Sequence, residues 1–123
     1  MIKGVERYFN SEYEPGRRPN CVGYVLYQLE IIDSDRFVDP GRFESYSFFE
    51  EVADVQLANA IAIMTIRDNY LYHLALIDKD DPNFVVHRPA TGAEIIREKL
   101  LLVYEAYQGS YLRSSFVRMK SSE

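Results

Sequence analysis

The residues of this sequence best suited to chemistry are one cysteine and two histidines. Cys21 is the only cysteine, and it directly follows Pro19-Asn20, a pair that favours the start of a helix. His73 and His87 are the only histidines, and they lie on either side of a predicted tight β-hairpin. A thiol at a helix N-terminus with two imidazoles nearby is an arrangement suited to nucleophilic catalysis on acyl bonds. We therefore take these three residues as the candidate catalytic set.

Each of the three would have its own role. A cysteine attacks as its thiolate, so the pKa of Cys21 would have to fall from about 8.5 toward neutrality. The partial positive charge of a helix N-terminus and a nearby imidazolium would both lower that pKa. His73 would act as the base and as the proton donor to the leaving amine. His87 would orient the ring of His73 and fix its tautomer, as the third member of a triad does.

The elements that must position these residues follow from the hydrophobic pattern. Asn20 is a suitable N-cap, and apolar residues at helical spacing predict a helix from Cys21 to about Asp33. A short helix is expected within residues 48–57, whereas residues 93–107 mix helical and strand patterns. Strands are predicted at 60–67, 70–77, 84–88 and 111–119. Helices followed by strands indicate an α+β fold, and 123 residues suit a single domain, 1–123.

The predicted hairpin brings the two histidines together. If Ile77 pairs with Asn83 or Phe84, His73 lies opposite His87 or its neighbour. Directly opposed side chains project from the same face, with Cβ atoms about 4.5–5.5 Å apart. We therefore expect the two imidazoles to touch. A shift of the register by one residue would put them on opposite faces.

Composition excludes several other classes of function. The net charge of −5 disfavours binding to nucleic acid, and one cysteine cannot form an internal disulfide. We expect no membrane segment and no signal peptide, which makes the cytoplasm the default location. No cofactor is expected. A metal site at Cys21, His73 and His87 is an open alternative, although the closely spaced ligand pairs of zinc sites are absent. Another is that Cys21 is a small buried apolar residue.

Four segments resemble, in order, the conserved segments of the NlpC/P60 cysteine peptidases. The segment at 20–25, Asn-Cys-Val-Gly-Tyr-Val, resembles the nucleophile motif Asp-Cys-Ser-Gly-Phe-Val. Residues 58–62 resemble the Gly-Asp-Leu-Val stretch that opens the first central strand of that family. Residues 73–77 resemble the His-Val-Gly-Ile-Tyr segment with the catalytic histidine, and 84–87 resemble the Phe-Ile-His-Ala segment with the third catalytic residue. The departures are Asn20 for aspartate, Val22 for serine, and alanine for glycine at Ala58 and Ala75.

This resemblance implies a papain-like core, in which an N-terminal helix carrying the nucleophile packs on a central antiparallel sheet. It implies hydrolysis of an amide bond through a thioester on Cys21, with peptidoglycan-derived peptides as substrates. An upstream tyrosine, Tyr13 or else Tyr8, would complete the oxyanion hole. Two alternatives stay open: a non-catalytic binding module on the same scaffold, and a cytoplasmic hydrolase or toxin acting on another acyl substrate. The sequence does not indicate an oligomeric state.

Overall fold

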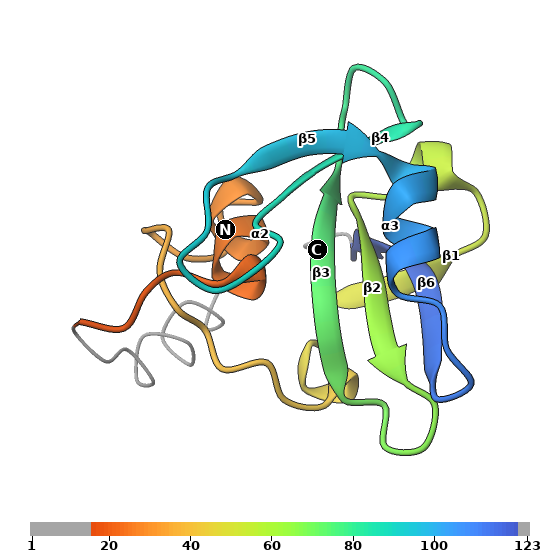
Figure 1. Cartoon of the computed structure of the whole chain (residues 1–123), viewed down its shortest axis with the longest axis horizontal. Coiled ribbons are helices and arrows are strands. Elements are labelled where there is room, and N and C mark those ends of the chain that lie inside the picture. Colours follow the sequence, from red (N-terminus) through yellow and green to blue (C-terminus); the bar gives the residue numbers. More distant parts are fainter. Residues whose placement is uncertain (1–15, 121–123) are drawn as a thin grey trace.

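The fold is a mixed α+β arrangement around one antiparallel sheet. A computed structural model describes residues 16–120, in which six strands pair in the order β1-β6-β2-β3-β4-β5 (Figure 1). The strands are β1 (Phe49–Val52), β2 (Ala60–Thr65), β3 (Leu71–Ile77), β4 (Phe84–His87), β5 (Ile96–Lys99) and β6 (Leu112–Met119). The described helices are α2 (Cys21–Gln28) and α3 (Leu100–Ala106), with short 3₁₀ turns at Phe43–Ser45 and Val55–Leu57. The predicted α+β class is confirmed at this level.

The two faces of the sheet carry separate hydrophobic clusters because side chains alternate along each strand. Leu74 and Leu76 of β3 belong to the face on which α2 and the aromatic residues of 43–49 pack. Ala75 and Ile77 belong to the opposite face, which α3 covers through Val103. In Figure 1, α2 lies beside β3, and α3 crosses the sheet near β2 and β6. The structure therefore places the two helices on different faces of one sheet.

The helix at Cys21 ends earlier than the predicted boundary near Asp33. It stops at Gln28, and Glu30 takes a left-handed backbone with φ of 61°. The N–H of Ile31 donates to the carbonyl of Leu26, and that of Glu30 to Tyr27, which together form a Schellman motif. Ile31 is then buried by the turned chain rather than by a continuing helix. The apolar residues beyond Gln28 therefore belong to a turn, and the predicted extension of the helix to Asp33 is wrong.

The short helix expected within residues 48–57 is also wrong in its main part. Phe49–Val52 forms β1, which pairs with β6 from Phe49 opposite Met119 to Val52 opposite Phe116. Only Val55–Leu57 turns, as a 3₁₀ segment. Pairing with a strand far along the chain overrides the weak local preference of this segment. The four predicted strands are confirmed, each within a few residues of its expected bounds.

Candidate functional site

The start of α2 is held by the side chain of Asn20. Its Oδ1 accepts from the N–H of Gly23 and from that of Val38, each at 3.1 Å, and its Nδ2 donates to the carbonyl of Val38 at 2.8 Å. The predicted N-cap is confirmed. The amide also fastens the loop around Val38 to the first turn of the helix. Cys21, the next residue, is thereby fixed at a helix N-terminus.

Gly23 is required by the same loop. A Cβ atom built on Gly23 would lie 1.6 Å from the carbonyl oxygen of Arg36, which is backbone and cannot move aside cheaply. The loop thus presses directly on the first turn of α2. Asn20 and Gly23 together set the position of Cys21 relative to the rest of the fold.

The two histidines meet across β3 and β4, although in a register different from the expected one. Ile77 pairs with Val85 and Leu76 with Val86, so His73 lies diagonal to His87 rather than directly opposite. Since diagonal neighbours share a face, the rings still touch. Nε2 of His73 lies 2.8 Å from Nδ1 of His87, and the rings meet edge to face at 5.0 Å. The expected contact between the imidazoles is confirmed.

Glu98 extends this pair, although it is not among the candidate residues that the sequence indicates. It lies on β5 opposite Val85, on the same face as His87, and its Oε2 is 2.6 Å from Nε2 of His87. The residue falls in the segment of mixed patterns, 93–107, for which no element was assigned. Recognising 96–99 as a strand paired with β4 would have placed a carboxylate beside His87. Glu98, His87 and His73 therefore form one hydrogen-bonded chain, here called the histidine relay.

The direction of the hydrogen bonds in the histidine relay follows from the carboxylate of Glu98 at its end. A carboxylate can only accept a hydrogen bond. Nε2 of His87 therefore carries a proton and donates a hydrogen bond to Glu98. In neutral His87, Nδ1 is then the acceptor, and Nε2–H of His73 donates to it. The remaining nitrogen of neutral His73, Nδ1, keeps its lone pair. The relay thus leaves His73 with a base at Nδ1, the nitrogen that points away from His87.

A tyrosine absent from the candidate set covers the ring of His73. Tyr107, which follows α3, stacks on His73 with centroids 4.7 Å apart and ring planes 14° apart. Tyr72 meets Tyr107 edge to face at 5.9 Å. The register between β2 and β3 skips Tyr72, since Ile63 pairs with His73 and Met64 with Leu71. Bulges of this kind redirect side chains and are common beside active sites.

The thiol of Cys21 lies beside the residue of β3 that follows His73. The backbone N–H of Leu74 hydrogen-bonds to the Cys21 sulfur, and the N–H groups of Val22 and Cys21 itself also face it. Burial, and then the charge of a Cys21 thiolate, raises the pKa of Tyr107. Between residues 16 and 120 no hydrogen bond joins the thiol to the His73 ring directly. The structure therefore brings Cys21, His73 and His87 into one region.

The protonation states differ from the expected thiolate. Burial raises the pKa of the Cys21 thiol above its ordinary value, and the three backbone N–H groups oppose this only in part. Burial, and then the charge of His87, lowers the pKa of His73 from 6.5 to about 3. The expectation that the pKa of Cys21 falls toward neutrality is therefore wrong for this resting structure. At neutral pH the thiol and the imidazole are both uncharged.

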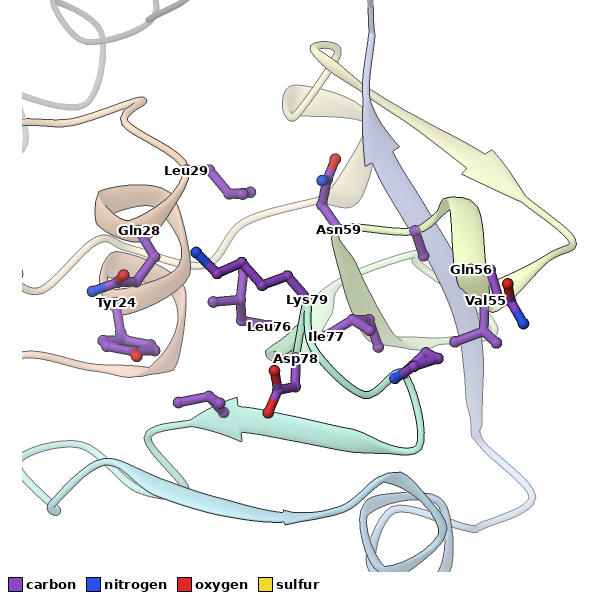
Figure 2. A pocket seen from close by; sticks show the side chains of 13 residues that line it. Tyr24, Gln28, Leu29, Val55, Gln56, Asn59, Leu76, Ile77, Asp78 and Lys79 are labelled. Atoms are coloured by element: carbon purple, nitrogen blue, oxygen red, sulfur yellow. The ribbon is translucent and has the colours of Figure 1, made fainter.

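A cavity of about 540 Å³ lies farther along β3 and does not include the three candidate residues (Figure 2). Its walls come from Tyr24 and Gln28 of α2 with Leu29 after it, the segment 55–59, the end of β3 with the loop that follows it, and Val86 of β4. A cavity alone is weaker evidence of chemistry than convergent reactive groups. We therefore locate the candidate active site at Cys21 and the histidine relay.

Three further observations bear on the candidate site. Tyr13 and Tyr8, named above for the oxyanion hole, lie outside the described residues. Within 16–120, the structure contains no group of three or more acidic, histidine or cysteine residues arranged to hold a metal ion. No helix in that same range is long and apolar enough to cross a membrane.

The fold and the site together define an α+β protein with a cysteine beside a His–His–Glu hydrogen-bonded chain. Comparison of the chain with models of protein families, with curated proteins and with solved structures finds no match.

Proposed function

We propose that this protein is a cysteine hydrolase with a papain-like NlpC/P60 core, which cleaves an amide bond through a thioester on Cys21. The observation that carries the proposal is the histidine relay. Its hydrogen bonds from Glu98 through His87 to His73 leave a lone pair on Nδ1 of His73. The thiol of Cys21 contacts the N–H of Leu74, the residue next to His73 in β3. A base and a nucleophile are thus available in one region.

In this mechanism Nδ1 of His73 takes the thiol proton while the sulfur of Cys21 attacks the carbonyl carbon. Because both groups are neutral at rest, proton transfer accompanies attack rather than preceding it. The imidazolium that forms keeps donating from Nε2 to His87, which donates in turn to Glu98. The tetrahedral intermediate then collapses, the C–N bond breaks, and the leaving amine takes the proton from His73.

Hydrolysis of the thioester repeats these steps with water. His73 removes a proton from the water that attacks the thioester carbonyl, and the Cys21 thiol leaves with that proton. The backbone N–H groups of Cys21 and Val22, which face the sulfur, are suitable donors to the developing oxyanion. Tyr13 would add a side-chain donor if it takes the role that the family resemblance implies.

Peptides derived from peptidoglycan are the proposed substrates, on the strength of the resemblance at Cys21, His73 and His87. A small peptide or muropeptide is accordingly the proposed partner. A hydrolase acting on a different acyl group would use the same residues.

One observation favours a second candidate, a non-catalytic binding module on the same scaffold. The pKa of Cys21 is raised and that of His73 is lowered to about 3, and both directions oppose the charged pair that activated cysteine enzymes use. In a binding module the histidine relay would be a buried structural network, and Cys21 would be a packed thiol.

Mass spectrometry of purified muropeptides incubated with the protein tests the proposal. We expect new fragments from the wild type and none from Cys21→Ala, which keeps a small residue at the helix start. A second arm uses p-nitrophenyl acetate and the intact mass of the protein. An acetyl adduct on Cys21 without muropeptide cleavage would keep the hydrolase and reject the substrate. Absence of both the adduct and cleavage would reject the hydrolase and favour the binding module.

A further inference from the structure

Both polar and apolar side chains line the cavity beside β3. Tyr24 and Gln28 of α2 line one side, and Lys79, which follows β3, extends toward them in Figure 2. Leu29 and Leu76 contribute apolar walls, and the rest come from Val55, Ala58, Pro82 and Val86. A volume of about 540 Å³ suits a small organic molecule.

Of the two charged residues of the cavity, Asp78 already has its charge balanced by an ion pair. Asp78 accepts from Nε of Arg97 at 2.5 Å, and its other oxygen accepts from the N–H of Asp80 at 2.9 Å. The bond from Arg97, and then the N–H of Asp80, lowers the pKa of the Asp78 carboxyl. Asp78 therefore stays ionised and paired, and it repels an incoming anion far less than a free carboxylate would.

The other charged residue, Lys79, has no ion-pair partner within the described range of the chain. It is exposed at the mouth of the cavity, where a ligand can reach its ammonium group. Uncharged hydrogen-bond donors also lie near the ammonium group. Asn59 uses its Oδ1 to accept from the N–H of Met119 at 2.8 Å, which leaves the amide N–H₂ for a ligand. The amide of Gln28 and the hydroxyl of Tyr24 offer further donors.

We propose that this cavity binds a small molecule that carries a carboxylate on an apolar body. The carboxylate pairs with the ammonium of Lys79, with the Asn59 and Gln28 amides as further donors, and the apolar body lies against Leu29 and Leu76. None of Cys21, His73 and Glu98 lines the cavity, so this binding does not depend on the proposed hydrolysis. The site stands even if the protein is not an enzyme.

Two matched probes test the carboxylate requirement, N-acetyl-leucine and its neutral analogue N-acetyl-leucinamide. Each is titrated into isotopically labelled protein while backbone amide signals are followed by NMR. We expect the acid to shift the amides of Gln28, Ala58 and Lys79, and to bind about tenfold more tightly than the amide, as expected for one charged hydrogen bond. Equal affinities for the acid and the amide would overturn the proposal, as would shifts confined to another face.

Substitutions of Lys79 make the test specific. Lys79→Gln should weaken binding of the acid about tenfold and leave the amide unchanged, while Lys79→Arg keeps the charge and should retain most of the affinity. Lys120→Gln makes the same change of net charge at another exposed lysine and should have little effect. An equal loss in Lys79→Gln and Lys120→Gln would show that only net charge matters, and would refute the assigned site.

Discussion

Lowering the pH below neutrality should destabilise this fold through one buried imidazole, that of His73. The ring is buried against His87 and stacked under Tyr107, and its pKa falls from 6.5 to about 3, chiefly because of burial. In the unfolded chain the pKa returns to about 6.5. The unfolded state therefore binds more protons between pH 6.5 and pH 3, and the free energy of unfolding rises with pH across that window.

The size of the effect follows from the two pKa values of His73. Linkage gives a loss of about 2 kcal/mol between pH 7 and pH 5, and about 4 kcal/mol by pH 3. No cost arises above the unfolded pKa, where the ring is neutral in both states. The groups that contact the ring include His87 and Tyr107, with Glu98 one hydrogen bond farther away.

Urea unfolding followed by circular dichroism at pH 7, 6 and 5 measures this loss in the wild type and in His73→Gln. Glutamine offers an N–H donor to Nδ1 of His87 but does not titrate. We expect the variant to lose about 2 kcal/mol less than the wild type between pH 7 and pH 5. His87 is the only other histidine and is present in both proteins. Parallel loss of stability in the two proteins would refute a buried neutral ring at His73.

Three other substitutions test how the site is built. Asn20→Ala leaves the N–H groups of Gly23 and Val38 without their acceptor, and should cost about 2–3 kcal/mol of unfolding free energy in urea. Gly23→Ala drives a methyl group into the carbonyl of Arg36, and should cost about 3 kcal/mol or prevent folding, as judged by the circular dichroism spectrum. Glu98→Gln lets an amide donate to His87 and reverse the direction of the hydrogen bonds in the relay. Acetylation of Cys21 by p-nitrophenyl acetate should then slow about 10²-fold or more. Glu94→Gln, at an exposed residue, is the control and should leave the rate unchanged.

The sequence patterns correctly predicted those parts of the fold that depend only on residues close together in the chain. The N-cap at Asn20 depends on one side chain and the turn that follows it, and the strand at 60–65 on a short run of buried residues. The end of α2 was misplaced because the Schellman turn at Glu30 has no glycine to mark it, and Ile31 continues the apolar pattern. Strand β1 was missed because it depends on pairing with β6, more than 60 residues later.

The candidate site divides in a similar way. His73 and His87 could be paired from the hairpin because a two-residue change of register keeps both on one face. Glu98 and Tyr107 could not be assigned, since each reaches the site from an element whose type the pattern of 93–107 leaves open. The protonation states were beyond sequence reasoning, because burial of Cys21 and His73 is a property of the packed structure.

Burial and hydrogen-bond direction act on His73 in opposite ways, and this contrast bears most on function. The histidine relay leaves Nδ1 of His73 as a base. Glu98 can only accept a hydrogen bond, so His87 donates to Glu98 and His73 donates to His87. Burial makes the protonated ring costly, so the base at Nδ1 is weak at rest. In a purely structural network, reversing the relay with Glu98→Gln would change stability but leave the reactivity of Cys21 unaffected. In an enzyme it would change the reactivity of the thiol far more than the stability. Measuring both quantities on Glu98→Gln therefore separates the two functions without knowledge of the natural substrate.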